Sequence, residues 1–311
     1  MTFAVLFPGQ GSQQVGMGAE LFASKKDLLG ERSDRILGWS LRDMCLDGPE
    51  EELTRTEHAQ PALFAISFAL WEHLSARLAA PPAGAAGHSL GEYTALAAAG
   101  SLSYEQALSI VARRGEAMAR AAARAESGMA ALLGADIELA EKVCELRRSR
   151  GGRLSVANIN APGQVVVAGS AADIEWVVDE ARELGVRRAI PLKVAGAFHS
   201  SFMDDAAEEV GLALGEADFA DLAFPVWSNT TAQPHHLEAL ATTLQRQVVA
   251  PVRFQESLEN MAAAGIDTFI HVGPGDVTAG MARRTLDDVT VQVVSSLPDI
   301  PSAIESLVTI G

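Results

Sequence analysis

The pentapeptide Gly87-His88-Ser89-Leu90-Gly91 is the strongest chemical signal in the chain. It follows a short apolar segment, 83–87, and precedes a stretch rich in Ala and Leu, so a strand, a sharp turn and a helix are expected there. In that context Gly-x-Ser-x-Gly is the pattern of a nucleophile elbow, in which small glycines let the turn push a serine hydroxyl out of the backbone. The helix N-terminus offers backbone N–H groups to a developing oxyanion. The pattern therefore predicts Ser89 as a nucleophile, although a Gly/Ser turn before a helix also arises by chance.

A nucleophilic serine needs a base, and histidine is the usual one. The chain contains seven histidines: His58, His73, His88, His199, His235, His236 and His271. His88 adjoins the serine and is expected to point elsewhere, whereas His235 is expected on a solvated loop and His271 in the core. His199 lies in the segment 196–201, directly after an expected strand, where α/β folds present functional residues. The residue types favour His199 only slightly, and on this ground the other histidines stay open.

Two adjacent arginines, Arg113 and Arg114, interrupt an otherwise apolar helical pattern. A guanidinium that faces a cleft can bind a carboxylate through two parallel hydrogen bonds. Spacing alone favours the more ordinary alternative, which is a solvated helix face.

The overall composition excludes several classes of protein. The 311 residues are 48% hydrophobic and 21% charged, which excludes a wholly disordered chain, a fibre or a coiled coil. The net charge of −16 makes the chain a poor nucleic-acid binder, because phosphate binding depends on clustered Lys and Arg. The glycines around Gln10 do not continue as G-x-G-x-x-G, and no G-K-[ST] occurs, so a dinucleotide site or a phosphate loop of these types is also excluded.

The cysteines and the uncharged runs predict a soluble, cytoplasmic protein that does not enter a membrane. Cys45 and Cys144 have no C-x-x-C spacing, and two small buried thiols suit a reducing compartment. The uncharged run 1–19 lacks the basic start of a signal peptide and is broken by a Pro-Gly pair. The run 154–172 contains too many polar residues and glycines to span a bilayer.

Apolar periodicity divides the chain into two regions that differ in the order of their expected helices and strands. In the first, the expected elements are a strand at 3–7, a helix at 59–78, a strand at 83–87 and helices at 90–99 and 104–124. In the second, they are a strand at 129–133, a helix at 136–150, strands at 154–158 and 165–168, a helix at 172–184 and a strand at 188–194. The order β-α-β-β-α-β is that of the split βαβ, ferredoxin-like motif.

We therefore predict an α/β fold in which a small ferredoxin-like domain, 125–193, is inserted into a large domain formed by 1–124 and 194–311. After the insertion we expect helices near 202–215 and 237–264, a strand at 268–272 and a Gly-Pro-Gly turn. The stretch after about residue 290 has no clear pattern.

Several segments, taken together and in order, resemble one protein family. They are Phe7-Pro8-Gly9-Gln10-Gly11-Ser12-Gln13, Gln60-Pro61-Ala62-Leu63, Gly87–Glu92, Arg114-Gly115, Asn160–Gly169, Ala197-Phe198-His199, Ser228-Asn229, Gln247 with Pro251-Val252, and Val272–Gly275. The chain is identified by them as similar to the malonyl-CoA:acyl carrier protein transacylases, from residue 2 to about 285. The resemblance implies a hydrolase-like large domain with a parallel sheet, together with the ferredoxin-like insert.

The resemblance also implies roles for individual residues. Ser89 would be the acylated nucleophile and His199 its base, oriented by a backbone carbonyl that falls near Gln247. The N–H groups of Gln10 and Leu90 would form the oxyanion hole. Three residues would contact the substrate. Arg114 would pair with the malonyl carboxylate, and the ring of Phe198 would disfavour a branched acyl group. Asn160 would face the cleft. The usual malonyl-selecting motif carries His where this chain has Gly196, which weakens the expectation of malonyl selection.

The implied reaction moves a malonyl group from malonyl-CoA to an acyl carrier protein. The phosphopantetheine thiol belongs to the carrier, and no bound cofactor or metal and a monomeric protein are expected. The pathway would be fatty acid synthesis or polyketide synthesis, where the protein could act in trans on a synthase. Two alternatives remain from the sequence: an editing acyl hydrolase, which Arg114 opposes, and a noncatalytic carrier-binding protein.

An acidic carrier would need local cations on this acidic chain. Three clusters of basic residues could supply these cations, and each could equally be a solvated helix end. The clusters are Arg147, Arg148, Arg150 and Arg153; Arg187, Arg188 and Lys193; and Arg283 and Arg284.

Overall fold

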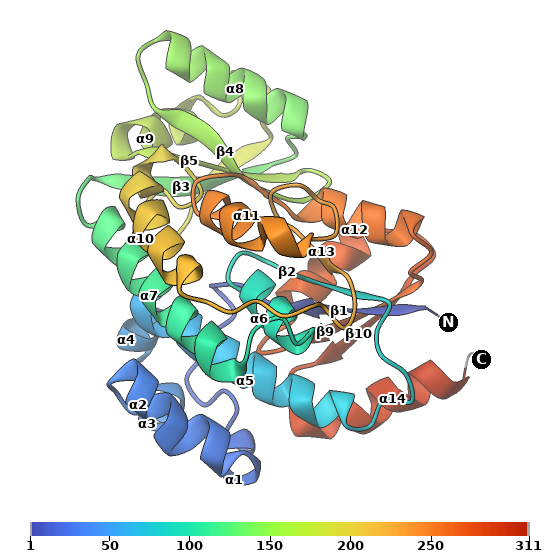
Figure 1. Cartoon of the computed structure of the whole chain (residues 1–311). Helices are drawn as coiled ribbons and strands as arrows, with labels where there is room; N and C mark the ends of the chain where they lie inside the picture. The colour runs from blue at the N-terminus through green and yellow to red at the C-terminus, as the bar shows by residue number, and fades with distance from the viewer. Residues whose placement is uncertain (1, 310–311) are drawn as a thin grey trace.

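A computed structural model describes residues 2–309, and Figure 1 shows its mixed α/β architecture. A five-stranded parallel sheet has the order β10-β9-β1-β2-β7. Its strands, in chain order, are β1 (Phe3–Phe7), β2 (Gly84–Gly87), β7 (Val226–Trp227), β9 (Thr268–Val272) and β10 (Thr290–Val294). The expected α/β class with a parallel sheet is thereby confirmed.

A second five-stranded sheet has the order β6-β3-β5-β4-β8 and lies above the first in Figure 1. Its strands are β3 (Ser127–Leu133), β4 (Leu154–Ala161), β5 (Gln164–Ser170), β6 (Arg188–Pro191) and β8 (Val252–Arg253). The pairs β3–β5, β3–β6 and β4–β5 are antiparallel. With the two intervening helices, the first four of these strands have the ferredoxin-like connectivity that the sequence indicates.

Fourteen α-helices are described among residues 2–309. They are α1 (Leu21–Ser24), α2 (Ser33–Leu37), α3 (Leu41–Leu46), α4 (Glu50–Thr54), α5 (Thr56–Ser75), α6 (Gly91–Ala98), α7 (Tyr104–Ala122), α8 (Ile137–Ser149), α9 (Ala171–Glu180), α10 (Asp204–Gly215), α11 (Leu240–Gln247), α12 (Phe254–Ala263), α13 (Val277–Thr285) and α14 (Ile300–Thr309). None of those described is long and apolar enough to cross a membrane.

Strand β1 shows why the parallel sheet needs helices on both faces. Phe3, Val5 and Phe7 belong to a large core cluster that also contains residues of α5, α6 and α7. Ala4 and Leu6 point the other way, into a second cluster with residues of α12 and α13. Both faces of the strand are therefore buried, which explains its continuous apolar sequence.

The second sheet also packs on both faces. One face, with Leu132 and Val167, packs into a cluster that includes residues of α8 and α9. The other face, with Met129 and Val166, belongs to the same large cluster as α5 and α7. The proposed domain boundaries at 125 and 193 remain a prediction, since the sheet also takes strand β8 from beyond them.

Strand β8 is the main departure from the expected elements. The sequence predicts helices across 237–264, but the structure breaks them between α11 and α12. Pro251 lacks a backbone N–H and disfavours helical geometry at the residue before it, so the chain leaves the helix and pairs with β4 through Asn158 and Ile159. Strand β10 and helix α14 lie in the stretch after 290, where no pattern indicated them.

Candidate active site

Ser89 lies on a sharp turn between strand β2 and helix α6. Its φ of +53° falls in the left-handed region, which non-glycine residues rarely occupy. The turn is so tight that a Cβ added to Gly87 would lie 1.9 Å from the carbonyl carbon of Gly91. The strand–turn–helix expected for a nucleophile elbow is therefore present, and the close approach explains why residue 87 is glycine.

This close approach predicts that Gly87→Ala destabilises the protein. The new methyl group would overlap backbone rather than a movable side chain, so we expect the free energy of unfolding to fall by about 3 kcal/mol. Gly215→Ala is the matched control, because nothing lies within 4 Å of a Cβ there and the residue is helical. That variant should change stability by less than about 1 kcal/mol in the same urea unfolding experiment. Equal effects of the two substitutions would contradict the tight turn.

Two amide side chains hold the strained turn in place. Asn229 donates from Nδ2 to the Gly87 carbonyl at 2.7 Å and accepts at Oδ1 from the Ser89 N–H at 2.8 Å. Gln247 donates from Nε2 to the Ser89 carbonyl at 2.8 Å. Strain of this kind persists only where the surroundings over-determine it, and these three hydrogen bonds do so.

His199 lies against the serine hydroxyl, and the two hydrogen bonds of its ring define its tautomer. Its Nδ1 is 2.8 Å from the backbone carbonyl oxygen of Gln247, which can only accept, so Nδ1 carries the proton. Its Nε2 is then the acceptor for the Ser89 hydroxyl, at 2.9 Å. This arrangement leaves the basic nitrogen directed at the hydroxyl proton.

Burial keeps His199 neutral. Burial and, after it, the positive charge of Arg114 lower the pKa of His199 to about 3, although the Gln247 carbonyl acts in the opposite direction. A histidine with this pKa is unprotonated at neutral pH and available as a base.

The lowered pKa predicts an unusual pH profile for acylation of Ser89. His199 accepts a proton only when neutral, so its function is lost as the pH falls through its folded pKa, near 3. An ordinary histidine with a pKa of 6.5 would lose about thirtyfold in its neutral fraction by pH 5. We expect initial acylation rates, measured by rapid quench on protein shown to be folded by circular dichroism, to vary less than about twofold from pH 7.5 to 5. A half-maximal rate near pH 6.5 would contradict the assignment.

Arg114 is fully buried behind the serine. It donates to the side-chain oxygens of Gln60 at 2.6 Å and Gln247 at 2.9 Å, and from Nη2 to Ser89 Oγ at 3.0 Å. The interpretation as a solvated helix face is therefore wrong for Arg114. It holds for its neighbour Arg113, which is paired with Glu216 at the surface.

A cavity of about 260 Å³ opens in front of Ser89, between the two sheets. Five other predicted site residues line it with Ser89: Gln10, Leu90, Asn160, Phe198 and His199. The remaining two, Arg114 and Gln247, lie behind Ser89 and are not part of the lining. Much of the remaining lining is apolar and comes from both parts of the chain: Met118, Met129, Val166, Leu192, Val194 and Met281. A cavity with an apolar wall and a few converging polar groups is typical of a small-molecule site.

The oxyanion hole expected from the backbone N–H groups of Gln10 and Leu90 remains a prediction. Both residues line the cavity beside Ser89, and none of the described residues accepts a hydrogen bond from either N–H. Asn160 reaches the elbow from strand β4, where its Oδ1 accepts from His88 Nε2 at 2.8 Å. The partner of His88 Nε2 is therefore Asn160, whereas the Ser89 hydroxyl bonds with His199 and Arg114.

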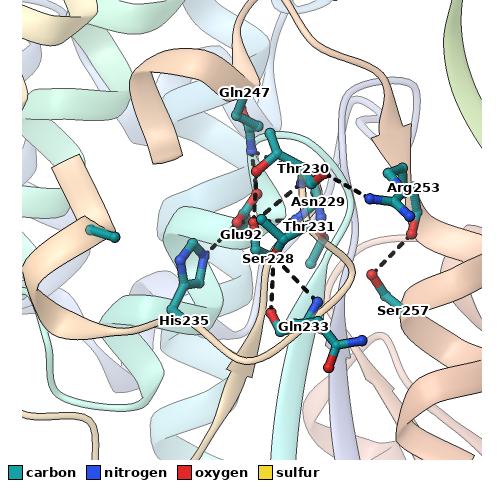
Figure 2. Close-up of polar contacts among 12 residues, drawn as sticks. Glu92, Ser228, Asn229, Thr230, Thr231, Gln233, His235, Gln247, Arg253 and Ser257 are labelled. Atoms are coloured by element: carbon teal, nitrogen blue, oxygen red, sulfur yellow. Dashed lines mark hydrogen bonds and ion pairs between the residues drawn. The ribbon is translucent and has the colours of Figure 1, made fainter. Parts of the chain in front are cut away.

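A buried polar network behind the elbow was missed from the sequence (Figure 2). Glu92 is fully buried and accepts from His235 Nε2 at 2.6 Å, from Gln247 Nε2 at 2.6 Å and from the Asn229 N–H at 3.2 Å. The expected solvated loop at His235 is wrong, since this side chain is 1% exposed. A single carboxylate within the apolar helix 91–98 was the signal that could have indicated such a network.

Comparison with known proteins agrees with this geometry. Residues 4–304 match the acyl transferase domain family. A malonyl CoA-acyl carrier protein transacylase of Bacillus subtilis (strain 168) is 41% identical over 309 residues, covering 98% of this chain and 96% of the relative. One from Staphylococcus aureus (strain MW2) is 37% identical over 301 residues, covering 96% of each chain.

Solved structures give the same result. The acyl-carrier-protein S-malonyltransferase of Bartonella henselae superimposes with a TM-score of 0.93 at 36% identity, over 99% of this chain and 100% of the other. A malonyl-transacylase solved in complex with a type II PKS acyl-carrier protein also gives a TM-score of 0.93, at 34% identity, over 98% of this chain and 100% of the other. The chain therefore belongs to the acyl transferase domain family, among the malonyl CoA-acyl carrier protein transacylases.

Proposed function

We propose that this protein transfers a malonyl group from malonyl-CoA to the phosphopantetheine thiol of an acyl carrier protein, through a malonyl ester on Ser89. The observation that carries the proposal is the environment of one oxygen atom. Ser89 Oγ lies 2.9 Å from the basic nitrogen of His199 and 3.0 Å from a buried guanidinium nitrogen of Arg114. A nucleophile with a base on one side and a cation on the other suits an acyl group that ends in a carboxylate. The names of the relatives support the same reaction.

In the first half-reaction His199 Nε2 takes the proton of Ser89 as the oxygen attacks the thioester carbonyl carbon. The Nδ1–H remains hydrogen-bonded to the backbone carbonyl of Gln247, and this hydrogen bond stabilises the imidazolium that forms. The backbone N–H groups of Gln10 and Leu90 hold the oxyanion of the tetrahedral intermediate. The C–S bond then breaks, His199 returns its proton to the departing thiolate, and CoA leaves.

In the second half-reaction the carrier's thiol takes the place of CoA. His199 accepts its proton, the thiolate attacks the malonyl ester, and Ser89 recovers its proton when the C–O bond breaks. CoA leaves before the carrier thiol reacts with the covalent malonyl ester, so ping-pong kinetics follow. The cofactor-like phosphopantetheine belongs to the carrier, and the chain itself needs no bound group for this chemistry.

Arg114 would give the reaction its preference for a carboxylated acyl group. In the free protein its Nη2 contacts Ser89 Oγ, so a malonyl chain extending from that oxygen brings its carboxylate towards the guanidinium. Phe198 is buried and lines the same cavity, where its ring would crowd a branch on the α-carbon. A pocket wall alone discriminates a methyl group by only about 10–200-fold.

We place the carrier's docking surface at the mouth of the cavity, near Lys193 and Arg284. Lys193 is exposed and lines the cavity, and Arg284 donates to Gln164, which also lines it. In the cluster 147–153, Arg147 is paired with Asp173 and Arg148 with Glu141, so these two cations are already neutralised. Three expectations remain predictions: a role in fatty acid or polyketide synthesis, a monomeric protein, and a cytoplasmic location.

The product of the acyl-enzyme distinguishes transfer from editing hydrolysis. With isotopically labelled malonyl-CoA and a holo acyl carrier protein, we expect most of the label on the carrier thiol and little free malonate. An apo carrier, which lacks the phosphopantetheine thiol, is the matched control and should accept none. Release of most of the label as the free acid in the presence of holo carrier would favour the hydrolase instead.

A further inference from the structure

Arg114 presents an electrostatic problem in the free protein. The guanidinium is fully buried, and its hydrogen bonds go to the neutral side chains of Gln60, Gln247 and Ser89. Among the described residues it has no ion pair with a carboxylate. A buried charge is costly unless nearby charges or dipoles compensate it.

Glu92 supplies that compensation through the side-chain amide of Gln247. The amide oxygen of Gln247 faces Arg114 at 2.9 Å, and its nitrogen faces Glu92 at 2.6 Å. The amide dipole is thus aligned between a cation and a carboxylate. Burial lowers the pKa of Arg114, and Tyr93 and, after it, the charge of Glu92 counteract this effect.

The carboxylate also defines which way the Gln247 amide is turned. An ionised carboxylate only accepts hydrogen bonds, so it requires the NH₂ end of the amide. The flipped amide would set its oxygen against Glu92 and its NH₂ group against Arg114, and both contacts would be repulsive. His235 and the Asn229 N–H hold the other carboxylate oxygen, so Glu92 itself cannot turn away (Figure 2).

We propose that Glu92, held by His235, is a positioning residue that sets the selectivity for carboxylated acyl groups by keeping the Gln247 side-chain oxygen on Arg114. This inference rests on the proposed malonyl transfer, and it concerns residues that touch neither the substrate nor Ser89 Oγ. It separates two functions of Gln247: the backbone carbonyl orients the base, whereas the side chain orients the carboxylate-binding arginine.

The test compares second-order rates of Ser89 acylation by malonyl-CoA and by acetyl-CoA, measured by intact-mass spectrometry on quenched samples. Glu92→Gln keeps the shape of the side chain but removes the carboxylate, so only Arg114 and the Ser89 carbonyl still favour this orientation of the Gln247 amide. We expect the malonyl-to-acetyl rate ratio to fall about 10- to 100-fold, the range for a lost hydrogen bond to a charged group. The acetyl rate should fall much less, because an acetyl group makes no use of Arg114 and loses only the support that Gln247 gives to the Ser89 carbonyl. Glu238→Gln, at an exposed position, is the matched control and should leave the ratio unchanged.

Two His235 variants keep the test decisive if Glu92→Gln does not fold. His235→Leu removes the donor to Glu92 and should lower the ratio about threefold or more. His235→Gln restores an N–H donor and should return the ratio towards that of the wild type. A structural role alone would lower both rates together and leave the ratio unchanged, and that result overturns the inference. Absence of a malonyl adduct on the wild type would instead refute the proposed function.

Discussion

Ser89→Ala should abolish the covalent malonyl adduct and lower transfer to the carrier by on the order of 10⁴-fold or more. The oxygen that forms the ester is lost, and within the described part of the chain no second hydroxyl is hydrogen-bonded to both His199 and Arg114. The variant should still fold, because the hydrogen bonds that hold the turn use the backbone of residue 89 rather than its side chain. The measurement is intact-mass spectrometry after exposure to malonyl-CoA, followed by a steady-state transfer assay.

Ser109→Ala is the control for this substitution. Ser109 is on helix α7 outside the lining of the cavity, so its removal should leave both the adduct and the transfer rate unchanged. The assignment of the nucleophile would be contradicted if Ser89→Ala still carried a malonyl adduct on another residue and still transferred malonyl to the carrier.

His199→Ala should slow acylation by about 10²- to 10⁴-fold, the usual contribution of a positioned general base. Without the imidazole no other side chain of residues 2–309 is bonded to Ser89 Oγ as a base, while Arg114 and the N–H groups proposed for the oxyanion hole stay in place. The adduct should therefore still form on Ser89, only far more slowly, and rapid-quench mass spectrometry measures the rate.

His236→Ala is the matched control, since His236 is exposed and next to the buried network without joining it. Its acylation rate should equal that of the wild type. If His199→Ala slows acylation less than tenfold, another group removes the proton, and the tautomer assigned to His199 has no catalytic consequence.

The part of the site that is local in sequence could be predicted from residue types alone. The strand, turn and helix around Ser89 lie within residues 84–98, and each has its own signal in apolar pattern or glycine content. Strand β1 was equally clear, because a strand buried on both faces is apolar throughout. Strand β9 is buried as well and was also predicted, although it contains Thr268 and His271.

The rest of the site depends on contacts between residues far apart in the chain. Asn229 lies 140 positions from Ser89, and Gln247 lies 158 positions from it. Only the family resemblance indicated a role for Gln247, and nothing indicated one for Asn229 beyond its place in a shared motif.

Arg113 and Arg114 show why spacing alone could not identify the buried arginine. Adjacent helical residues point about 100° apart, so the packing of α7 decides which of the two is buried.

His235 and strand β8 were missed for the same physical reason. A histidine after a proline is usually solvated, but here helix α6 brings Glu92 within 2.6 Å of it. The two-residue strand β8 is too short to produce a pattern, and it forms only because β4 offers an edge for pairing.

Malonyl transfer through Ser89 is tested by exposing the wild-type protein separately to malonyl-CoA and acetyl-CoA, measuring its intact mass, and locating any adduct by peptide mapping. We expect rapid addition of one malonyl group to Ser89 and much slower acetylation, with Arg114→Lys reducing the malonyl rate selectively. Equal or preferred labelling by acetyl-CoA, or a malonyl group on a residue other than Ser89, would contradict it.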